Sequence, residues 1–195
     1  MVRLDTASVP AAAAALTEAF FEDSLVVRLC PNRQTRARAI LPVFRFSASM
    51  SAHYGEAWAS SPEMEAVALW LYSDKMACPP WQWLLFGGWD IRRCLGREGY
   101  RELNRVSARI DRARDRVAPE RYLYLSSLGV RKEYRRQGLA AELVGRRVRE
   151  AASQGLSTVV ETNTPEALAF YRAIGFRVLT GFYTAGLHYY VLIYG

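Results

Sequence analysis

One segment of the chain combines residue types and spacing that suit an anion-binding site. Residues 130–141 read Val-Arg-Lys-Glu-Tyr-Arg-Arg-Gln-Gly-Leu-Ala-Ala. A loop that leads into a helix N-terminus offers free backbone N–H groups, and the helix dipole favours a negative charge beside them. Gly138 lets the backbone approach the anion closely, and the small Ala140 keeps the way clear. The segment therefore predicts a site for a small anion.

The nature of the anion is narrowed by what this segment lacks. No Gly-Lys-Ser/Thr follows it, as a P-loop requires, and it does not contain the Gly-x-Gly-x-x-Gly of dinucleotide sites. A nucleoside triphosphate or a dinucleotide is therefore not the natural ligand, and a pyrophosphate of another kind fits better.

The elements that position this segment are the most regular part of the chain. Hydrophobic patterning predicts a strand over 122–130, an amphipathic helix over 138–153 and a strand over 157–162. A strand, helix and strand at this spacing form a βαβ unit, which indicates a parallel pair with a right-handed crossover. A helix over 165–174 and two strands that meet near Ala185-Gly186 complete the chain.

The front half predicts a further set of helices and strands. Pro42 lies inside the second helix, so we expect a kink there or two separate helices. The predicted elements are a strand near 2–5, a helix from Thr6 or Ser8 to Phe20, a helix over 33–54, strands over 55–60 and 65–72, and a long helix over about 91–117.

Residues 73–120 form a helical insert that is rich in aromatic side chains. Trp81, Trp83, Trp89 and Tyr100 indicate either a local core or a wall of the acceptor pocket that would suit a flat or apolar amine. Arginines recur at every fourth residue from Arg93 to Arg109, with acidic residues beside them. This pattern favours a solvated helix surface with ion pairs over a nucleic-acid stripe.

Composition limits the class of protein. The chain has 195 residues, 51% hydrophobic, and a net charge of +7, which indicate one folded domain over 1–195. Three cysteines without a CxxC pair and two histidines make a zinc site improbable, so we expect no metal. No apolar run is long enough to cross a bilayer, and the N-terminus does not read as a signal peptide. We therefore expect a cytoplasmic protein that binds neither membrane nor nucleic acid.

The anion-binding segment resembles a known family. Arg135-x-x-Gly138-x-Ala140 matches the Arg/Gln-x-x-Gly-x-Gly/Ala signature of the GNAT acetyltransferases, and Phe170-Tyr171-x-x-x-Gly175-Phe176 stands where the family has a similar segment. The specific resemblance covers about residues 121–177. Among the members, the chain most resembles puromycin N-acetyltransferase and similar small-molecule acetylases.

This resemblance implies an α/β fold, the acyl-CoA N-acyltransferase fold. Its sheet is mixed and mostly antiparallel, with about seven strands and a splayed central parallel pair, and acetyl-CoA is the co-substrate. Residues 128–130 would pair with the pantetheine arm, and an N–H near Gly129 or Val130 would polarise the thioester carbonyl. The cofactor-binding residues implied are Leu128, Gly129, Val130, Arg135, Arg136, Gln137, Gly138, Leu139, Ala140, Ala141 and Tyr171. Many members also have an Asn seven residues before the Tyr. Thr164 stands at that position here, so the neighbouring Asn163 is a further candidate.

Two residues are candidates for proton transfer. Tyr171 stands where many members protonate the departing thiolate, and its alternative role is aromatic packing. An alkyl amine is protonated at neutral pH, so the reaction calls for a base. Glu161 lies on the predicted strand over 157–162, beside the gap between the splayed strands where the acetyl group would lie. Its alternative role is a structural carboxylate. Glu56, Glu65 and His188 are weaker candidates for the base.

These observations predict an acetyl-CoA-dependent N-acetyltransferase that acts by direct attack of a small-molecule primary amine. One alternative is acetylation of a protein or peptide amine, and another is an acyl-CoA-binding regulatory module without catalysis. A nucleic-acid binder is a third reading, which the balanced arginines disfavour. The fold is compatible with a homodimer, and no single residue indicates the oligomeric state.

Overall fold

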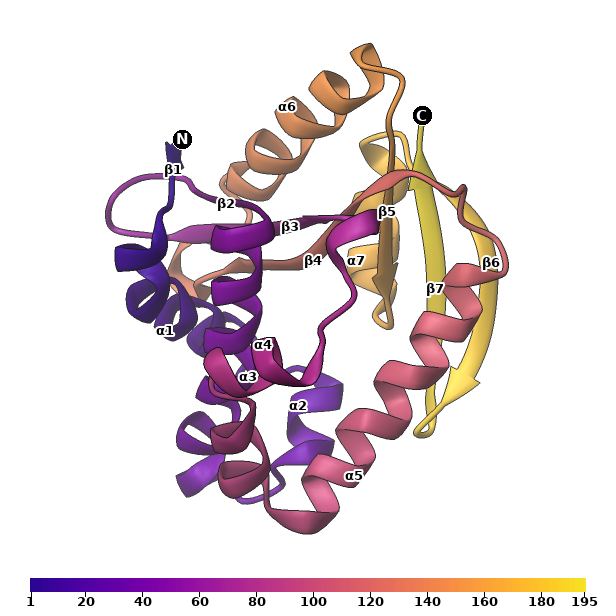
Figure 1. Cartoon of the computed structure of the whole chain (residues 1–195). Coiled ribbons are helices and arrows are strands. Elements are labelled where there is room, and N and C mark those ends of the chain that lie inside the picture. Colours follow the sequence, from indigo (N-terminus) through magenta and orange to yellow (C-terminus); the bar gives the residue numbers. More distant parts are fainter.

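The computed structural model describes residues 1–195, and a single seven-stranded sheet runs through the chain (Figure 1). Neighbouring strands are antiparallel except β4 and β5, which are parallel. The predicted mixed sheet with a central parallel pair is therefore confirmed. In spatial order the strands are β1 (Val2–Arg3), β2 (Gly55–Ala59), β3 (Ala66–Tyr72), β4 (Tyr122–Val130), β5 (Ser157–Thr162), β7 (Leu187–Tyr194) and β6 (Arg177–Thr184).

Helices cover both faces of the sheet, because alternate residues of each strand face opposite cores. On β3, Ala66, Ala68 and Trp70 pack beneath α6 (Leu139–Ser153) and α7 (Pro165–Ala173). Val67 and Leu69 face α1 (Val9–Ala19) and α3 (Arg33–Tyr54) on the other side.

The second half of the sheet has its own helix on the α1–α3 side. The long helix α5 (Gly88–Asp115) packs Val106 and Ala113 against β5, β6 and β7. The short α2 (Ser24–Leu29) contacts both α3 and α5, and α4 (Pro80–Leu85) leads into α5 (Figure 1). None of these helices is both long enough and apolar enough to span a membrane.

Several details of the helices differ from the prediction. α3 passes through Pro42 as one helix, so of the two alternatives predicted there, two separate helices is wrong. α5 is interrupted at Gly96, whose φ of 70° and ψ of 179° are not helical, so the predicted long helix is two helices joined at a kink. The six-residue helices α2 and α4 were not predicted, because neither is long enough to show a hydrophobic period.

A buried ion pair ties α6 to the first hairpin of the sheet. Nε and Nη2 of Arg147 lie 2.8 and 2.7 Å from the two carboxylate oxygens of Glu56. Tyr72 and Trp58 donate hydrogen bonds to the same carboxylate at 2.7 and 3.0 Å. Burial acts to raise the pKa of Glu56, but the hydrogen bonds and the Arg147 charge outweigh it and hold the pKa at about 2.

This ion pair predicts acid sensitivity. Because the folded-state pKa lies below the ordinary 4.5, ionised Glu56 stabilises the fold above pH 4.5, and this stabilisation disappears as the pH falls toward 2. The difference corresponds to about 3 kcal/mol of the free energy of unfolding. We expect Glu56→Gln to flatten the pH dependence of thermal unfolding between pH 5 and 2.5, whereas Glu98→Gln at an exposed site leaves it unchanged. A profile for Glu56→Gln as steep as that of the wild type contradicts this account.

Candidate active site

The central parallel pair separates partway along its length. β4 pairs with β5 only from Tyr122↔Ser157 to Tyr124↔Val159, although β4 continues to Val130. Beyond this point, β5 pairs only with β7. On its other side, the register of β4 with β3 shifts between Leu125 and Ser127, so Ser126 forms a bulge. A gap therefore opens between two neighbouring strands of one sheet.

A cavity of about 570 Å³ lies where the strands separate. It brings together many of the residues predicted from the sequence, namely Leu128, Gly129, Val130, Arg135, Arg136, Ala140 and Tyr171. The remaining predicted residues do not line its wall, namely Gln137, Gly138, Leu139, Ala141, Asn163 and Glu161. The cavity is formed by the end of β4, the loop before α6, the first two turns of α7 and the segment that follows α1.

The loop before α6 presents free backbone N–H groups. Arg136 and Gly138 have left-handed backbone conformations, with φ of 62° and 83°, and no side chain caps the helix that begins at Leu139. A left-handed conformation is strained for Arg136, and such strain is typical of ligand-binding loops. A methyl group added at Gly138 would meet no atom within 4 Å, so open space borders the loop. This arrangement fits a pyrophosphate.

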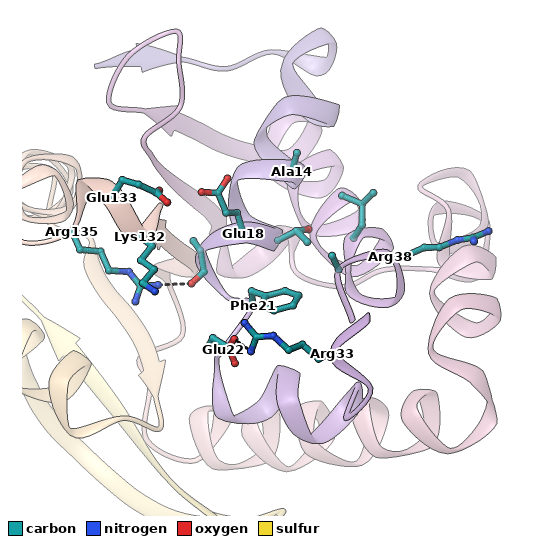
Figure 2. A pocket seen from close by; sticks show the side chains of 13 residues that line it. Ala14, Glu18, Phe21, Glu22, Arg33, Arg38, Lys132, Glu133 and Arg135 are labelled. Atoms are coloured by element: carbon teal, nitrogen blue, oxygen red, sulfur yellow. Dashed lines mark hydrogen bonds and ion pairs between the residues drawn. The ribbon is translucent and has the colours of Figure 1, made fainter. Parts of the chain in front are cut away.

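Arg135 has a structural contact in addition to its place on the cavity wall. Its Nη2 donates to the carbonyl of Ala19 at 2.7 Å, and its Nε donates to the carbonyl of Val130 at 3.2 Å. The guanidinium thus joins the end of α1 to the end of β4. Arg135 also lines a neighbouring surface groove of about 810 Å³ between α1 and α3, whose lining includes several charged side chains (Figure 2).

The open backbone at Gly138 predicts the effect of a single methyl group. Gly138→Ala forces an L-residue into a left-handed conformation, which costs about 1–2 kcal/mol, and places the methyl group in the space expected for the ligand. We expect coenzyme A to bind at least about tenfold more weakly in calorimetry, a loss of about 1.4 kcal/mol, because the methyl group displaces the pyrophosphate, whereas the backbone strain is the same with and without the ligand. Gly155→Ala is the matched control, since Gly155 has φ of 72° with nothing within 4 Å but lies after α6. Equal losses of affinity in both variants argue against an anion site at this loop.

Tyr171 extends from α7 to the cavity. The residue is only 5% exposed, and its ring packs against Phe170 and Phe176 at centroid distances of 5.1 and 5.3 Å. Burial and, to a smaller extent, the charge of Glu161 raise the pKa of the Tyr171 hydroxyl well above its ordinary value. The hydroxyl therefore stays protonated at neutral pH and can act as a proton donor.

Glu161 lies on β5 beyond the last residue that pairs with β4, and its carboxylate is paired with an arginine. Its side chain is 5% exposed, and Oε1 lies 3.1 Å from Nη1 of Arg114 at the end of α5. Burial raises the pKa of Glu161, although Arg114 and a hydrogen bond with Tyr124 oppose the rise. The sequence predicted its place beside the gap, but the pairing with Arg114 is a new finding.

The cavity wall also contains residues that the sequence analysis did not select. They are Ala19, Phe20, Glu22, Asp23, Thr164, Glu166, Ala167 and Phe170. Asp23 and Thr164 could have been found as caps, because each side chain accepts hydrogen bonds from the first turn of a helix, α2 and α7 respectively. By contrast, Trp81 and Trp89 of the insert are 60% and 58% exposed, and neither they nor Trp83 and Tyr100 line this cavity.

Comparison of the sequence with protein families gives one match. The model of the acetyltransferase (GNAT) family matches residues 71–176, which is more than half of the chain. The matched region spans β4, the loop before α6, and α7. No curated protein sequence matches the chain significantly.

Solved structures with the same fold cover almost the whole chain. A protein described as histone acetyltransferase HPA2 and related acetyltransferase from Corynebacterium glutamicum has a TM-score of 0.66 at 18% identity, covering 98% of this chain and 93% of its own. A protein described as insect arylalkylamine N-acetyltransferase 7, from the yellow fever mosquito Aedes aegypti, has a TM-score of 0.64 at 14% identity, with coverages of 98% and 85%. The C-terminal condensation domain of Ebony, in complex with beta-alanyl-dopamine, has a TM-score of 0.65 at 9% identity, with coverages of 99% and 96%. At sequence identities of 9–18%, the structural similarity establishes the fold alone.

Proposed function

Because the chain belongs to the acetyltransferase (GNAT) family, we propose that it transfers an acetyl group from acetyl-CoA to a primary amine of a small molecule. The observation that carries the proposal is the combination of three features around one cavity. These are the splayed end of β4, the uncapped start of α6 and the hydroxyl of Tyr171. A thioester bound along β4 with its pyrophosphate at α6 would place the acetyl group near Tyr171.

The residues of the chain suit direct transfer. The backbone of residues 128–130 would hold the pantetheine arm by strand-like hydrogen bonds, and a free N–H beyond Tyr124 would stabilise the oxyanion. The amine nitrogen forms a bond to the acetyl carbon, the carbon–sulfur bond breaks, and Tyr171 gives its proton to the thiolate. Tyr171 regains a proton from the attacking nitrogen, and the proton of the original ammonium leaves to solvent through a base. Glu161 remains the predicted base.

The size of the cavity suits a small-molecule ligand. Specific small-molecule sites commonly enclose about 300–1,000 Å³, and the cavity of about 570 Å³ lies in this range. Arylalkylamines come first among the acceptors to test, since one structural neighbour is an arylalkylamine N-acetyltransferase and another binds beta-alanyl-dopamine. We also propose that the preference of the chain among small-molecule amines is similar to that of puromycin N-acetyltransferase.

Turnover of acetyl-CoA with a panel of amines, followed as free thiol, tests the function. Thiol release with small amines, and not with peptides, supports the proposal. Release only with peptides supports the protein or peptide alternative, and tight binding of acetyl-CoA without thiol release supports a regulatory module. The expected cytoplasmic location, the homodimer and the absence of nucleic-acid binding stay predictions.

A further inference from the structure

We propose that the turn from α4 into α5 docks on the surface of a bilayer that contains anionic phospholipids. This surface does not line the cavity, so the inference goes beyond the proposed function. The expectation that the chain does not bind a membrane rests on the lack of a spanning segment, and a surface contact needs none. The docking face is defined by seven exposed side chains, namely Trp81, Leu84, Leu85, Trp89, Arg38, Arg92 and Arg93.

The exposed apolar side chains of the chain are concentrated at this turn. Trp81, Leu84, Leu85 and Trp89 are 60%, 64%, 67% and 58% exposed. They are four of the seven large hydrophobic side chains that the whole chain leaves exposed, and all four lie within residues 81–89. Single exposed apolar residues are normal, but several on one small surface are typical of a face that binds a partner.

The opposite side of the same turn is fixed to the body of the protein. Nε2 of Gln82 donates a hydrogen bond to the hydroxyl of Tyr54 on α3 at 2.9 Å. Phe86 is buried and packs its ring against Tyr54 at a centroid distance of 6.0 Å. The ring of Trp83 lies so close to Gly88 that a methyl group there would come within 2.2 Å of it. The exposed side chains therefore point to solvent from a firmly packed turn.

Three arginines lie beside the apolar side chains. Trp89, Arg92 and Arg93 are three and four positions apart, so they share one face of the first turns of α5. The guanidinium carbon of Arg92 lies 5.7 Å from the centroid of the Trp89 ring. Arg38 of α3 lines a surface hollow of about 250 Å³ together with Arg93. Asp90 is the one acidic residue between Gly88 and the kink in α5, so positive charge predominates at the docking face.

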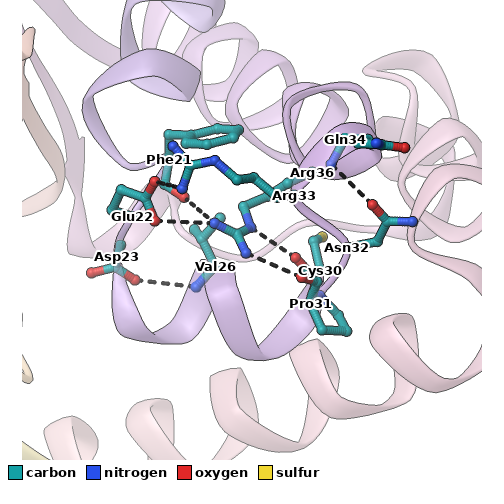
Figure 3. Close-up of polar contacts among 10 residues, drawn as sticks. All are labelled: Phe21, Glu22, Asp23, Val26, Cys30, Pro31, Asn32, Arg33, Gln34 and Arg36. Carbon is teal, nitrogen blue, oxygen red and sulfur yellow. Dashed lines mark hydrogen bonds and ion pairs between the residues drawn. The ribbon is translucent and has the colours of Figure 1, made fainter.

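The arginines of the docking face differ from their neighbours in having no acidic partner. At the start of α3, Arg33 and Arg36 both form ion pairs with Glu22 (Figure 3). Further along α5, Arg105 pairs with Glu102. In contrast, none of the three arginines of the docking face forms an ion pair within the protein. Their charges are therefore free for an anionic partner.

An anionic bilayer matches both the apolar and the basic part of the docking face. More than half of each apolar side chain projects into solvent, so the partner must accommodate protruding groups. In a bilayer, indole rings lie at the level of the headgroups, leucines enter the acyl region and arginines bind lipid phosphates. A second copy of the chain fits less well, because a twofold contact centred on this face would bring the same arginines of both copies together.

Sedimentation of the full chain with lipid vesicles tests the docking face. We expect the chain to bind vesicles of phosphatidylcholine and phosphatidylglycerol, and to bind vesicles of phosphatidylcholine alone more weakly by about fivefold for each arginine that reaches the surface. Added salt should weaken the binding to the anionic vesicles.

Trp81→Ser/Trp89→Ser removes the two indole rings and should weaken binding to the anionic vesicles at least about tenfold. Both side chains are exposed, so the midpoint of thermal unfolding should change little. Tyr183→Ser is the control for an exposed aromatic residue, since Tyr183 is 73% exposed on β6.

Arg92→Gln/Arg93→Gln tests the basic part of the docking face. We expect binding to the anionic vesicles to weaken about ten- to thirtyfold, with no change for vesicles of phosphatidylcholine alone. Arg121→Gln/Arg177→Gln is the matched control, because it removes the same charge from two exposed arginines outside the docking face. Equal weakening in the two double variants would mean that only the net charge of the chain matters, which overturns a specific docking face.

Two further results would also overturn the proposal. One is a wild-type chain that binds neither kind of vesicle, or binds both equally well. The other is a dimer in light scattering that Trp81→Ser/Trp89→Ser abolishes, since a second copy would then cover this face. Lipids brominated on their acyl chains should quench tryptophan fluorescence in the wild type and not in Trp81→Ser/Trp89→Ser, because the remaining Trp58, Trp70 and Trp83 are half-buried or buried.

Discussion

Replacing Tyr171 by Phe is expected to lower kcat about a hundred- to ten-thousandfold, which is the contribution of a positioned general acid. The KM for acetyl-CoA should stay the same, because the ring of phenylalanine keeps the contacts with Phe170 and Phe176. Free thiol released from acetyl-CoA in the presence of phenethylamine measures both constants.

The stability of this variant is part of the expectation. Burial and the charge of Glu161 account for the raised pKa of Tyr171, and no hydrogen bond from the protein contributes. Removing the hydroxyl therefore leaves no buried group unpaired, and the midpoint of thermal unfolding should change little. Tyr183→Phe is the control, since Tyr183 is 73% exposed on the edge strand β6. A loss of kcat below threefold in Tyr171→Phe would show that another group protonates the thiolate.

Most of the elements around the site could be predicted because their signals are local. The bounds of β4 and β5 agree with the prediction to the residue, and α6 and α7 agree within one residue at each end. Alternating and β-branched residues mark the strands, and Gly138 and Pro165 mark helix starts. The sequence signature around Gly138 also located the loop whose left-handed residues the structure shows.

The features that the sequence did not reveal depend on contacts between distant residues. Arg114 and Glu161 are 47 positions apart, and the pattern of neither segment shows that the two side chains pair. Glu56 and Arg147, whose side chains form the ion pair between β2 and α6, are 91 positions apart. The bulge at Ser126 is a mismatch between two strands, so the pattern of one strand does not contain it. Local patterns thus predict elements, and the pairing of elements determines the polar partners.

Loss of Arg114 is expected to be the most destabilising of the substitutions considered. Arg114 is 4% exposed, lies 3.1 Å from Glu161, and has its guanidinium carbon 4.7 Å from the centroid of the Tyr124 ring. Arg114→Met leaves the buried carboxylate without its cation, so we expect the free energy of unfolding to fall by about 3–5 kcal/mol. Urea denaturation measures this loss. Arg105→Met is the control, because Arg105 forms an exposed ion pair with Glu102, and such pairs contribute at most about 1 kcal/mol.

Combining substitutions at Arg114 and Glu161 distinguishes the two roles open to Glu161. In Arg114→Met/Glu161→Met, no buried charge is left unpaired, so stability should recover by several kcal/mol relative to Arg114→Met alone. If Glu161 serves only the ion pair, turnover recovers together with stability. If Glu161 is the base, turnover stays low in the double variant, and Glu161→Gln lowers turnover mainly at low pH with acetyl-CoA affinity unchanged. Loss of acetyl-CoA binding in Glu161→Gln would instead indicate a structural role, because the carboxylate then supports the strand beside the cofactor and not the reacting amine.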